Sequence, residues 1–334
     1  MPEASLPQPS PPLGESSSAD VAPRSNPLHY LRLARPHQWA KSAFVLVGPL
    51  YGMSDHKGTW QELLLPAFVA AGAFALASSA CYVVNDIMDA DADRAHPRKR
   101  NRPIASGAIR PASAWVFAVM LAIAAGLLLL AIPASVRPWV ALAVGLYVLN
   151  VSAYSWLLKH VVIADVIGLS LGFVLRVLGG CAAAAVEPST WLLNCTFFLA
   201  MFLAFGKRLG ERRSLGSGEA AAAARAVQGA YTSDLLRMVV VVTAVATLLS
   251  YAGYVQAKEN LYWQGFNLLW LTVLPATFGL LRCIVLLERG DFDDPTELAL
   301  HDRAFQLAAG VFAFLTIWLL VAFRQWGMAA DAIP

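Results

Sequence analysis

The sequence predicts an all-α membrane protein, a multi-spanning bundle of about nine transmembrane helices. Of its 334 residues, 58% are hydrophobic and only 14% are charged, whereas about a quarter of the residues in a typical soluble domain are charged. Its mean hydropathy is +0.57. Apolar windows long enough to approach or cross ~30 Å of hydrocarbon recur along the chain. They cover residues 40–54, 62–86, 112–132, 137–158, 161–184, 190–206, 236–256, 264–287 and 304–326, and the first is the weakest.

The remaining segments are read as tail, linker and loop. Residues 1–27 are rich in Pro, Ser and Ala and contain no apolar stretch, so they can form neither a signal-peptide core nor a fold. We therefore expect a disordered tail at 1–27 and one transmembrane domain at 28–334. Residues 219–229 are predicted to be a helical linker, and 288–297 to contain a helix start without a catalytic role. The four cysteines lie inside predicted spans without CxxC spacing, which favours apolar packing over ligands or disulfides.

Lys and Arg are distributed unevenly between alternate loops. The N-terminal tail and the loops on its side of the membrane hold 20 Lys and Arg residues, and the loops on the opposite side hold four. Basic loops of membrane proteins stay in the cytoplasm. We therefore expect a multi-pass cell-membrane protein whose N-terminus and charged loops are cytoplasmic. Because those loops share one face of the membrane, they can build one polar site there.

An acidic motif directly follows the second apolar window. At 100° per residue, Asp86, Asp89 and Asp93 share a helical face, and Asn85 lies one turn below Asp89. Like charges on one face repel each other, and carboxylates at the C-terminal end of a helix oppose its dipole. Bound Mg²⁺ would reverse this, since it prefers oxygen ligands and often bridges carboxylates to phosphates. The three aspartates are therefore candidate catalytic and metal-binding residues, and the alternative is a solvated acidic helix end.

The acidic motif is continued by a basic loop that contains Lys99, Arg100 and Arg102. Cations beside metal-binding carboxylates suit a polyphosphate, whose remaining charge they neutralise. Topology and attraction to anionic lipids explain several of these charges equally well. They do not explain the adjacent acidic face, so we interpret the two segments together as a magnesium-diphosphate site.

Two charged residues lie inside the fifth apolar window. Asp165 and Arg176 are eleven residues apart, which returns them to nearly the same face about three turns, or ~16 Å, along a helix. They cannot pair directly with each other. Arg176 is expected to face the bundle interior, because an unpaired cation in the membrane is costly. It is either a substrate-binding residue or a structural cross-link between closely packed helices, since Gly168, Gly172 and Gly179 lie near the same face.

The pattern NDxxDxxxD followed by KRxRPIxxG, at residues 85–107, resembles the first signature of the UbiA-type intramembrane prenyltransferase superfamily. The similarity covers approximately residues 30–326. It implies a nine-helix bundle that binds an isoprenyl diphosphate through Mg²⁺ and acidic motifs. It also implies that an acceptor attacks the resulting carbocation in a cavity open to lipid.

Further stretches resemble one branch of that superfamily, the decaprenyl-phosphate phosphoribosyltransferases. They are residues 35–41 (RPHQWAK), Tyr154-Ser155, Leu158-Lys159, Asp165 with Arg176, Gly179-Gly180, and Lys207-Arg208 with Glu211. Ser42 departs from that branch, which usually has Asn there. Prenyltransferases of the superfamily generally carry a second acidic motif after the sixth helix, whereas residues 205–213 here are basic with a single carboxylate. The resemblance therefore implies phosphoribosyl diphosphate as the donor and a polyprenyl phosphate as the acceptor.

On this hypothesis, Asn85 and the three aspartates hold Mg²⁺ on the donor diphosphate, and cations share the charge of the phosphates. The remaining candidate substrate-binding residues are Gln38, Lys41, Lys99, Arg100, Arg102, Tyr154, Lys159, Asp165, Arg176, Lys207 and Arg208. The alternative interpretation is that Tyr154 is an interfacial anchor and Lys159 a topology marker. The expected partners are the bilayer and the two substrates, with no nucleic acid, and a homo-oligomer is compatible with the sequence. Two alternatives stay open: a prenyltransferase with an aromatic acceptor, and a non-catalytic transporter or scaffold.

Overall fold

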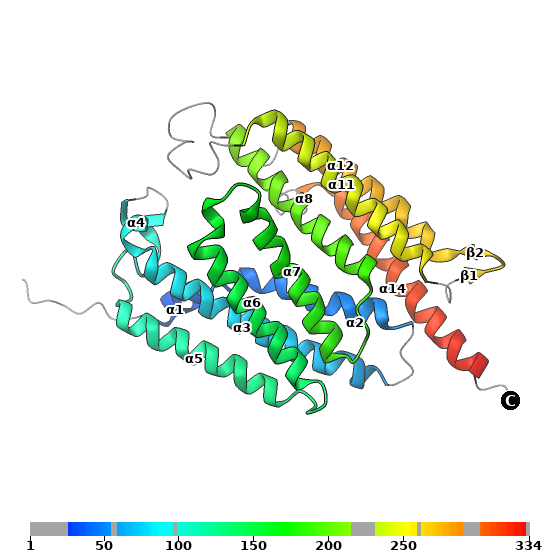
Figure 1. Cartoon of the computed structure of the whole chain (residues 1–334), viewed down its shortest axis with the longest axis horizontal. Helices are drawn as coiled ribbons and strands as arrows, with labels where there is room; N and C mark the ends of the chain where they lie inside the picture. Colours follow the sequence, from blue (N-terminus) through cyan, green and yellow to red (C-terminus); the bar gives the residue numbers. More distant parts are fainter. Residues whose placement is uncertain are drawn as a thin grey trace, which may run out of the picture.

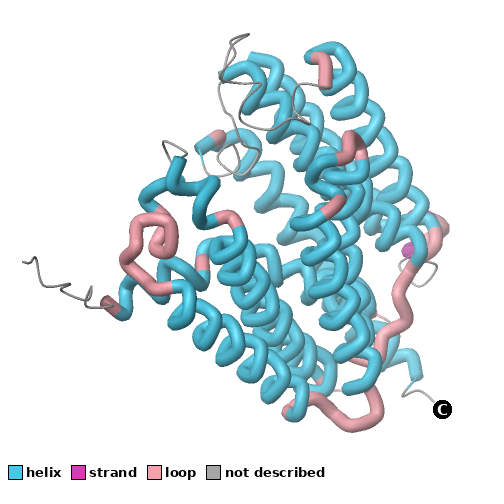
Figure 2. Tube along the Cα trace, turned by 60° about the vertical axis from the view of Figure 1, so that its left-hand side comes forward, coloured by secondary structure: helices cyan, strands magenta, loops and turns pink. Residues whose placement is uncertain are grey.

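The computed structural model describes residues 26–54, 59–95, 99–214, 231–258, 262–289 and 301–331. The predicted tail up to residue 25, the predicted linker at 219–229 and most of the predicted loop at 288–297 lie outside these ranges. The described part is almost wholly helical, as Figure 2 shows, with a single two-residue hairpin, β1 (Tyr262–Trp263) and β2 (Phe266–Asn267). This confirms the predicted all-α class.

Within the described ranges, eight helices are long and apolar enough to cross a membrane. Each of the predicted windows from the second to the ninth falls on one of them. They are α3 (Trp60–Met88), α5 (Pro111–Leu130), α6 (Arg137–Trp156), α7 (Ala164–Ala183), α8 (Thr190–Ser214), α11 (Ser233–Gln256), α12 (Val273–Arg289) and α14 (Arg303–Asp331). They form one elongated bundle, and the short hairpin and the C-terminus lie at the end opposite α4 (Ala90–Ala95) (Figure 1).

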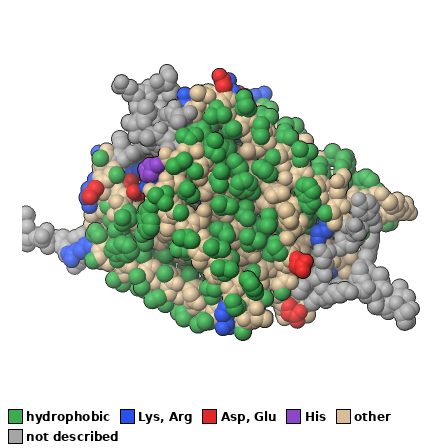
Figure 3. Space-filling view, viewed as in Figure 1, with side chains coloured by type: hydrophobic (Ala, Val, Ile, Leu, Met, Phe, Trp, Pro, Cys, Tyr) green, Lys and Arg blue, Asp and Glu red, His purple; other side chains and the backbone are tan. Residues whose placement is uncertain are grey.

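The outer surface of these helices is apolar. On α5, for example, the side chains of Val116, Val119, Ile123 and Leu127 are between 53% and 62% exposed. Figure 3 shows hydrophobic side chains covering the flank of the bundle, with charged groups gathered towards its ends. Apolar surface on this scale is stable in contact with lipid tails and not in water. The protein is therefore a multi-pass membrane protein.

The first predicted window, 40–54, is not a continuous α-helix, and the prediction is wrong in this detail. The segment consists of α1 (Pro27–Ala34), the 3₁₀ helix η1 (Pro36–Leu46) and α2 (Val47–Gly52). α1 ends at Arg35, whose backbone is left-handed with φ 52°, and Pro36 then prevents the helix from continuing unbroken. In Figure 1 this blue segment runs from α1 near the α4 end of the bundle to α2 near the opposite end.

The irregular segment packs its backbone directly against α7. Gly180 of α7 has no room for a side chain, because a Cβ atom there would overlap the carbonyl oxygen of Val45 in η1. Gly48 of α2 also lies close to α7, and a Cβ atom there would overlap the side-chain sulfur of Cys181. Small residues thus let η1 and α2 lie in the interior of the bundle, where α7 and α3 flank η1.

We expect Gly180→Ala to destabilise the protein by about 1–3 kcal/mol, because the added methyl group meets backbone rather than a movable side chain. Thermal unfolding of the purified protein in detergent measures the effect. Gly310→Ala on α14 is the matched control, since a Cβ atom at Gly310 meets nothing within 4 Å. Equal melting temperatures for the two variants would contradict the close approach of η1 and α7.

Candidate active site

Two buried aspartates form the centre of the candidate site. Asp86, in the last turn of α3, and Asp93, on α4, are each only 3% exposed. One guanidinium nitrogen of Arg102, Nη1, donates to Asp86 Oδ1 at 3.1 Å and to Asp93 Oδ2 at 2.6 Å. Lys99 Nζ lies 3.9 Å from the other oxygen of Asp93. The basic loop therefore folds back onto the acidic motif, and the two segments form one ion-paired cluster.

A second guanidinium reaches the same carboxylate from the N-terminal segment. Arg35 Nη2 donates to Asp86 Oδ1 at 2.6 Å. The left-handed backbone of Arg35 costs roughly 1–2 kcal/mol in a residue with a Cβ atom, and the ion pair with a buried carboxylate offsets that cost. Arg35 lies in the stretch 35–41 that carries part of the family resemblance, but it was not among the predicted site residues. Its proximity to Asp86 depends on the break between α1 and η1, which the sequence did not predict.

Asp89 differs from the other two aspartates of the predicted set in its exposure and in its ion-pair partner. α3 ends at Met88, and Asp89 caps it with φ −89° and ψ 2°. Backbone hydrogen bonds from Asp89 N–H to Asn85 O at 2.9 Å and from Asp93 N–H to Asp89 O at 2.8 Å continue the helical turn into α4. Asp89 is partly exposed and lies 3.6 Å from Lys159 Nζ, in the short 3₁₀ helix η3 (Leu158–His160) between α6 and α7. The predicted cluster is thus two adjacent groups, a buried pair and a separate Asp89–Lys159 ion pair.

The remaining predicted residues around this cluster differ in exposure. Gln38 and Asn85 are half-buried, whereas Lys41 and Arg100 are exposed. Tyr154 is half-buried on α6, and its ring packs close to the backbone of α7 at Gly168.

A second buried cluster joins α7 to α8 and to Tyr231, two residues before α11. Asp165 Oδ2 lies 2.5 Å from Arg208 Nη2, and both side chains are almost fully buried. Tyr231 donates its hydroxyl hydrogen to Asp165 Oδ1 at 2.9 Å. Arg208 Nε and Nη1 are buried and have no hydrogen-bond partner in the described part of the chain. Lys207, by contrast, is exposed, so the two neighbouring cations that the sequence treated alike lie in opposite environments.

Tyr231 also holds the turn that carries Lys159. Its hydroxyl oxygen accepts a hydrogen bond from the backbone of Ile163 at 2.6 Å, and Ile163 has φ 69°, a conformation rare for a β-branched residue. Burial raises the pKa of Tyr231 to about 12, so the hydroxyl stays protonated and donates to Asp165 at neutral pH. Tyr231 is therefore a positioning residue for the α6–α7 turn, and sequence analysis missed it.

We expect Tyr231→Phe to lower stability by about 1–3 kcal/mol, because the Ile163 N–H loses its partner in a buried place. Thermal unfolding in detergent measures the change. Tyr30→Phe is the control, since Tyr30 packs through its ring against Phe117 at 5.2 Å and the substitution removes only a hydroxyl. If both variants melt like the wild type, Tyr231 does not hold the turn.

Arg176 is buried in the middle of the bundle, as predicted. Its Nη2 donates to the hydroxyl oxygens of Ser78 on α3 and Tyr147 on α6, at 3.0 and 2.9 Å, and Nη1 donates to the carbonyl of Gly172 at 3.0 Å. The guanidinium also stacks 4.4 Å from the centre of the Tyr147 ring. These contacts tie three helices together, which is the geometry of a structural cross-link.

All four cysteines lie in described helices as free thiols.

The donor set of the buried pair fits Mg²⁺ in its chemistry. Asp86 and Asp93 offer carboxylate oxygens that already converge on one cationic nitrogen, and Mg²⁺ prefers hard oxygen ligands. No group of three or more His, Cys, Asp and Glu side chains lies close enough to hold a metal ion within the ranges that the structure describes. To complete the predicted set of three, Asp89 would have to leave Lys159.

Fold and site together define a polytopic membrane protein with an ion-paired, carboxylate-centred site at one end of its helical bundle. The model of the family described as "UbiA prenyltransferase family" matches residues 43–305, and the chain belongs to this family. This confirms the resemblance that the acidic motif and the basic loop indicated.

The chain is similar along most of its length to proteins of known name. It is 33% identical over 296 residues to the decaprenyl-phosphate phosphoribosyltransferase of Mycobacterium tuberculosis. That alignment covers 88% of this chain and 94% of the mycobacterial protein. The protein of the same name from Corynebacterium glutamicum is also 33% identical over 296 residues, covering 86% and 85%. A UbiA homolog from Archaeoglobus fulgidus, solved with GPP and Mg²⁺, has a TM-score of 0.61 and 18% identity, covering 89% of this chain and 99% of that one. At that identity the structural likeness shows the fold.

Proposed function

We propose that this protein transfers 5-phosphoribose from phosphoribosyl diphosphate to a polyprenyl phosphate, such as decaprenyl phosphate, with release of diphosphate. The observation that carries the proposal is the composition of the site: two buried carboxylates surrounded by the cations Arg35, Lys99 and Arg102. The names of the curated relatives that align with most of this chain support it.

Asp86 and Asp93 would hold Mg²⁺ through their carboxylate oxygens, with Asp89 and Asn85 beside them. When bound, the ion neutralises charge on the departing diphosphate. Arg102 donates to both carboxylates in the structure described here, and its guanidinium would turn to the diphosphate oxygens when the ion takes its place. Arg35, Lys99, Arg100 and Lys41 then share the remaining charge, where negative charge develops in the transition state.

Loss of diphosphate breaks the C1–O bond of ribose and leaves an oxocarbenium-like centre. The phosphate oxygen of the lipid acceptor forms the new bond at C1. Because the acceptor is already an anion at neutral pH, no strong general base is needed. Lys159, on the turn held by Tyr231, and Lys207 would position the acceptor phosphate. Asp165 accepts a hydrogen bond from Tyr231 and pairs with Arg208, so the two residues support that turn through Tyr231.

The cellular setting follows from the substrates and from the charges. The donor is water-soluble and the acceptor cannot leave the bilayer, so a site at a membrane surface meets both. With 20 Lys and Arg on the side of the site and four opposite, we propose that the protein lies in the cell membrane with this site in the cytoplasm.

Purified full-length protein tests the proposal. Incubated with ribose-labelled phosphoribosyl diphosphate and polyprenyl phosphate, it should form a labelled lipid and diphosphate in equal amounts when Mg²⁺ is present and not in excess chelator. Transfer from a labelled prenyl diphosphate to an aromatic acid would instead identify a prenyltransferase. If no diphosphate is released from either donor, the protein is not a transferase of this kind.

A further inference from the structure

An elongated apolar groove of about 440 Å³ lies between α3, α5 and α6, within the ~300–1,000 Å³ typical of ligand sites. Small side chains make it hollow, because alanine and glycine recur on all three helices where they face it. Among them are Ala77, Ala125, Gly126 and Gly145. A Cβ atom added at Gly126 or Gly145 would meet nothing within 4 Å, so the space belongs to the groove rather than to a neighbouring side chain.

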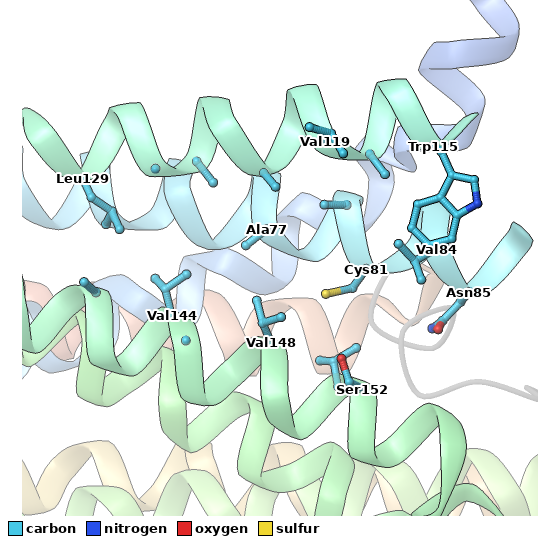
Figure 4. Close-up of a pocket in the computed structure, with 18 of the residues that line it drawn as sticks. Ala77, Cys81, Val84, Asn85, Trp115, Val119, Leu129, Val144, Val148 and Ser152 are labelled. Carbon is cyan, nitrogen blue, oxygen red and sulfur yellow. The ribbon is translucent and has the colours of Figure 1, made fainter. Parts of the chain in front are cut away.

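The groove runs lengthwise along the bundle and is polar at one end only. Trp115 and Asn85 lie together at one end in Figure 4, and Leu129 lies at the other. Leu129 follows Trp115 by fourteen positions on α5, which corresponds to ~21 Å of helix. Ser152 supplies a hydroxyl group near the Asn85 end (Figure 4). The rest of the lining is almost entirely apolar.

The polar end of the groove is formed by residues that neighbour the candidate active site in the chain. Asn85 lines the groove and precedes Asp86 directly in the last turn of α3. Trp156, at the same end of α6, is three residues from Lys159, which pairs with Asp89. A molecule with a long apolar chain and an anionic head would therefore place its chain in the groove and its head among the cations.

Resting on the proposed function, we propose that this groove holds the first part of the isoprenoid chain of the acceptor, with its phosphate at Asn85 and Lys159. Val119 lines the groove and is 53% exposed on the lipid-facing side of α5, so the chain can enter sideways from the bilayer. Lipid tails are as apolar as the groove, so the groove adds little hydrophobic affinity. Its contribution is orientation: it fixes the direction from which the phosphate approaches C1 of ribose.

Filling the deep part of the groove tests this assignment. Gly126→Leu and Gly145→Leu each place a side chain in open space, and Gly145 lies about 16 Å along α6 from Trp156. Kinetics of the full-length protein compare a long polyprenyl phosphate with a short isoprenyl phosphate whose chain ends before Gly145. We expect the long-to-short ratio of kcat/KM to fall about tenfold, equivalent to ~1.4 kcal/mol, in both variants. Gly310→Leu, an exposed glycine of α14 with open space around it, should keep the wild-type ratio.

A labelling experiment identifies the occupant directly. A polyprenyl phosphate with a photoactivatable group in its first isoprene units should label peptides of α5 and α6, and unlabelled polyprenyl phosphate should displace it while phospholipid should not. Displacement by phospholipid to the same extent, or an unchanged ratio in both glycine variants, overturns the assignment. Failure of the proposed function is distinguishable, because a wild-type protein without transferase activity would still report in the labelling experiment whether a polyprenyl phosphate lies in the groove.

Discussion

Asp86→Asn is expected to lower the rate of polyprenyl-phosphate-dependent diphosphate release by at least about a hundredfold, the usual cost of removing one preorganised electrostatic group. Asp86 is the carboxylate on which Arg35 and Arg102 both converge, and we propose it as a ligand of Mg²⁺. The amide keeps the shape of the side chain but removes its charge. The measurement is the initial rate at saturating donor, acceptor and Mg²⁺.

Asp91→Asn is the matched control for this prediction. Asp91 lies in the same acidic segment, but its side chain is 94% exposed and pairs only with Arg94 among the ion pairs of the described residues. This variant should retain wild-type activity. Thermal unfolding of both variants separates loss of catalysis from loss of folding. An Asp86→Asn protein that is folded and transfers phosphoribose at the wild-type rate would remove Asp86 from the mechanism.

Asp165→Asn is expected to destabilise the protein by about 3–5 kcal/mol, because it leaves the charge of Arg208 buried without a counter-ion. Arg208 already has two buried nitrogens without a hydrogen-bond partner in the described ranges, and the ring of Tyr231, centred 5.6 Å from its Cζ, carries no charge that could replace a carboxylate. The loss is measured as a lower melting temperature in detergent.

The double variant Asp165→Asn, Arg208→Met separates an ion-pair effect from a requirement for each residue. Replacing both partners of a buried pair is often neutral or stabilising, so the double variant should recover most of the stability that the single variant loses. If it is as unstable as the sum of the two single variants, the Asp165–Arg208 pair does not act as a unit. Its transferase activity would then show whether Arg208 has a role beyond packing.

The sequence predicted the membrane spans well because their signal is local. Twenty apolar residues in a row are sufficient to define α5 or α11, whatever the rest of the chain does. The first window was predicted wrongly for the same reason, since η1 is held inside the bundle by its contact with Gly180 on α7, a residue more than 130 positions away. Periodicity carries no information about such a contact.

The candidate site was predictable as a set of residues but not as a set of pairs. The acidic motif and the basic loop lie within 20 residues of each other, and they do meet. Asp89 pairs with Lys159, and helical periodicity within one segment does not predict a partner on the turn between α6 and α7. Likewise, Lys207 and Arg208 are adjacent in sequence, and only the position of Asp165 on α7 decides that Arg208 is buried. Tyr231 gave no signal, because a single tyrosine outside a motif is unremarkable until its neighbours are known.

The 3₁₀ geometry of η1 also bears on how the chain is assembled in the bilayer. A segment with Pro36, His37, Gln38 and Lys41 and with poorer hydrogen bonds than an α-helix is not stable on its own among lipid tails. The helices that enclose it, α3 and α7, are synthesised after it. Residues 36–52 must therefore reach their final place after the later helices have been inserted. The order in which this membrane protein is completed differs from the order in which it is translated.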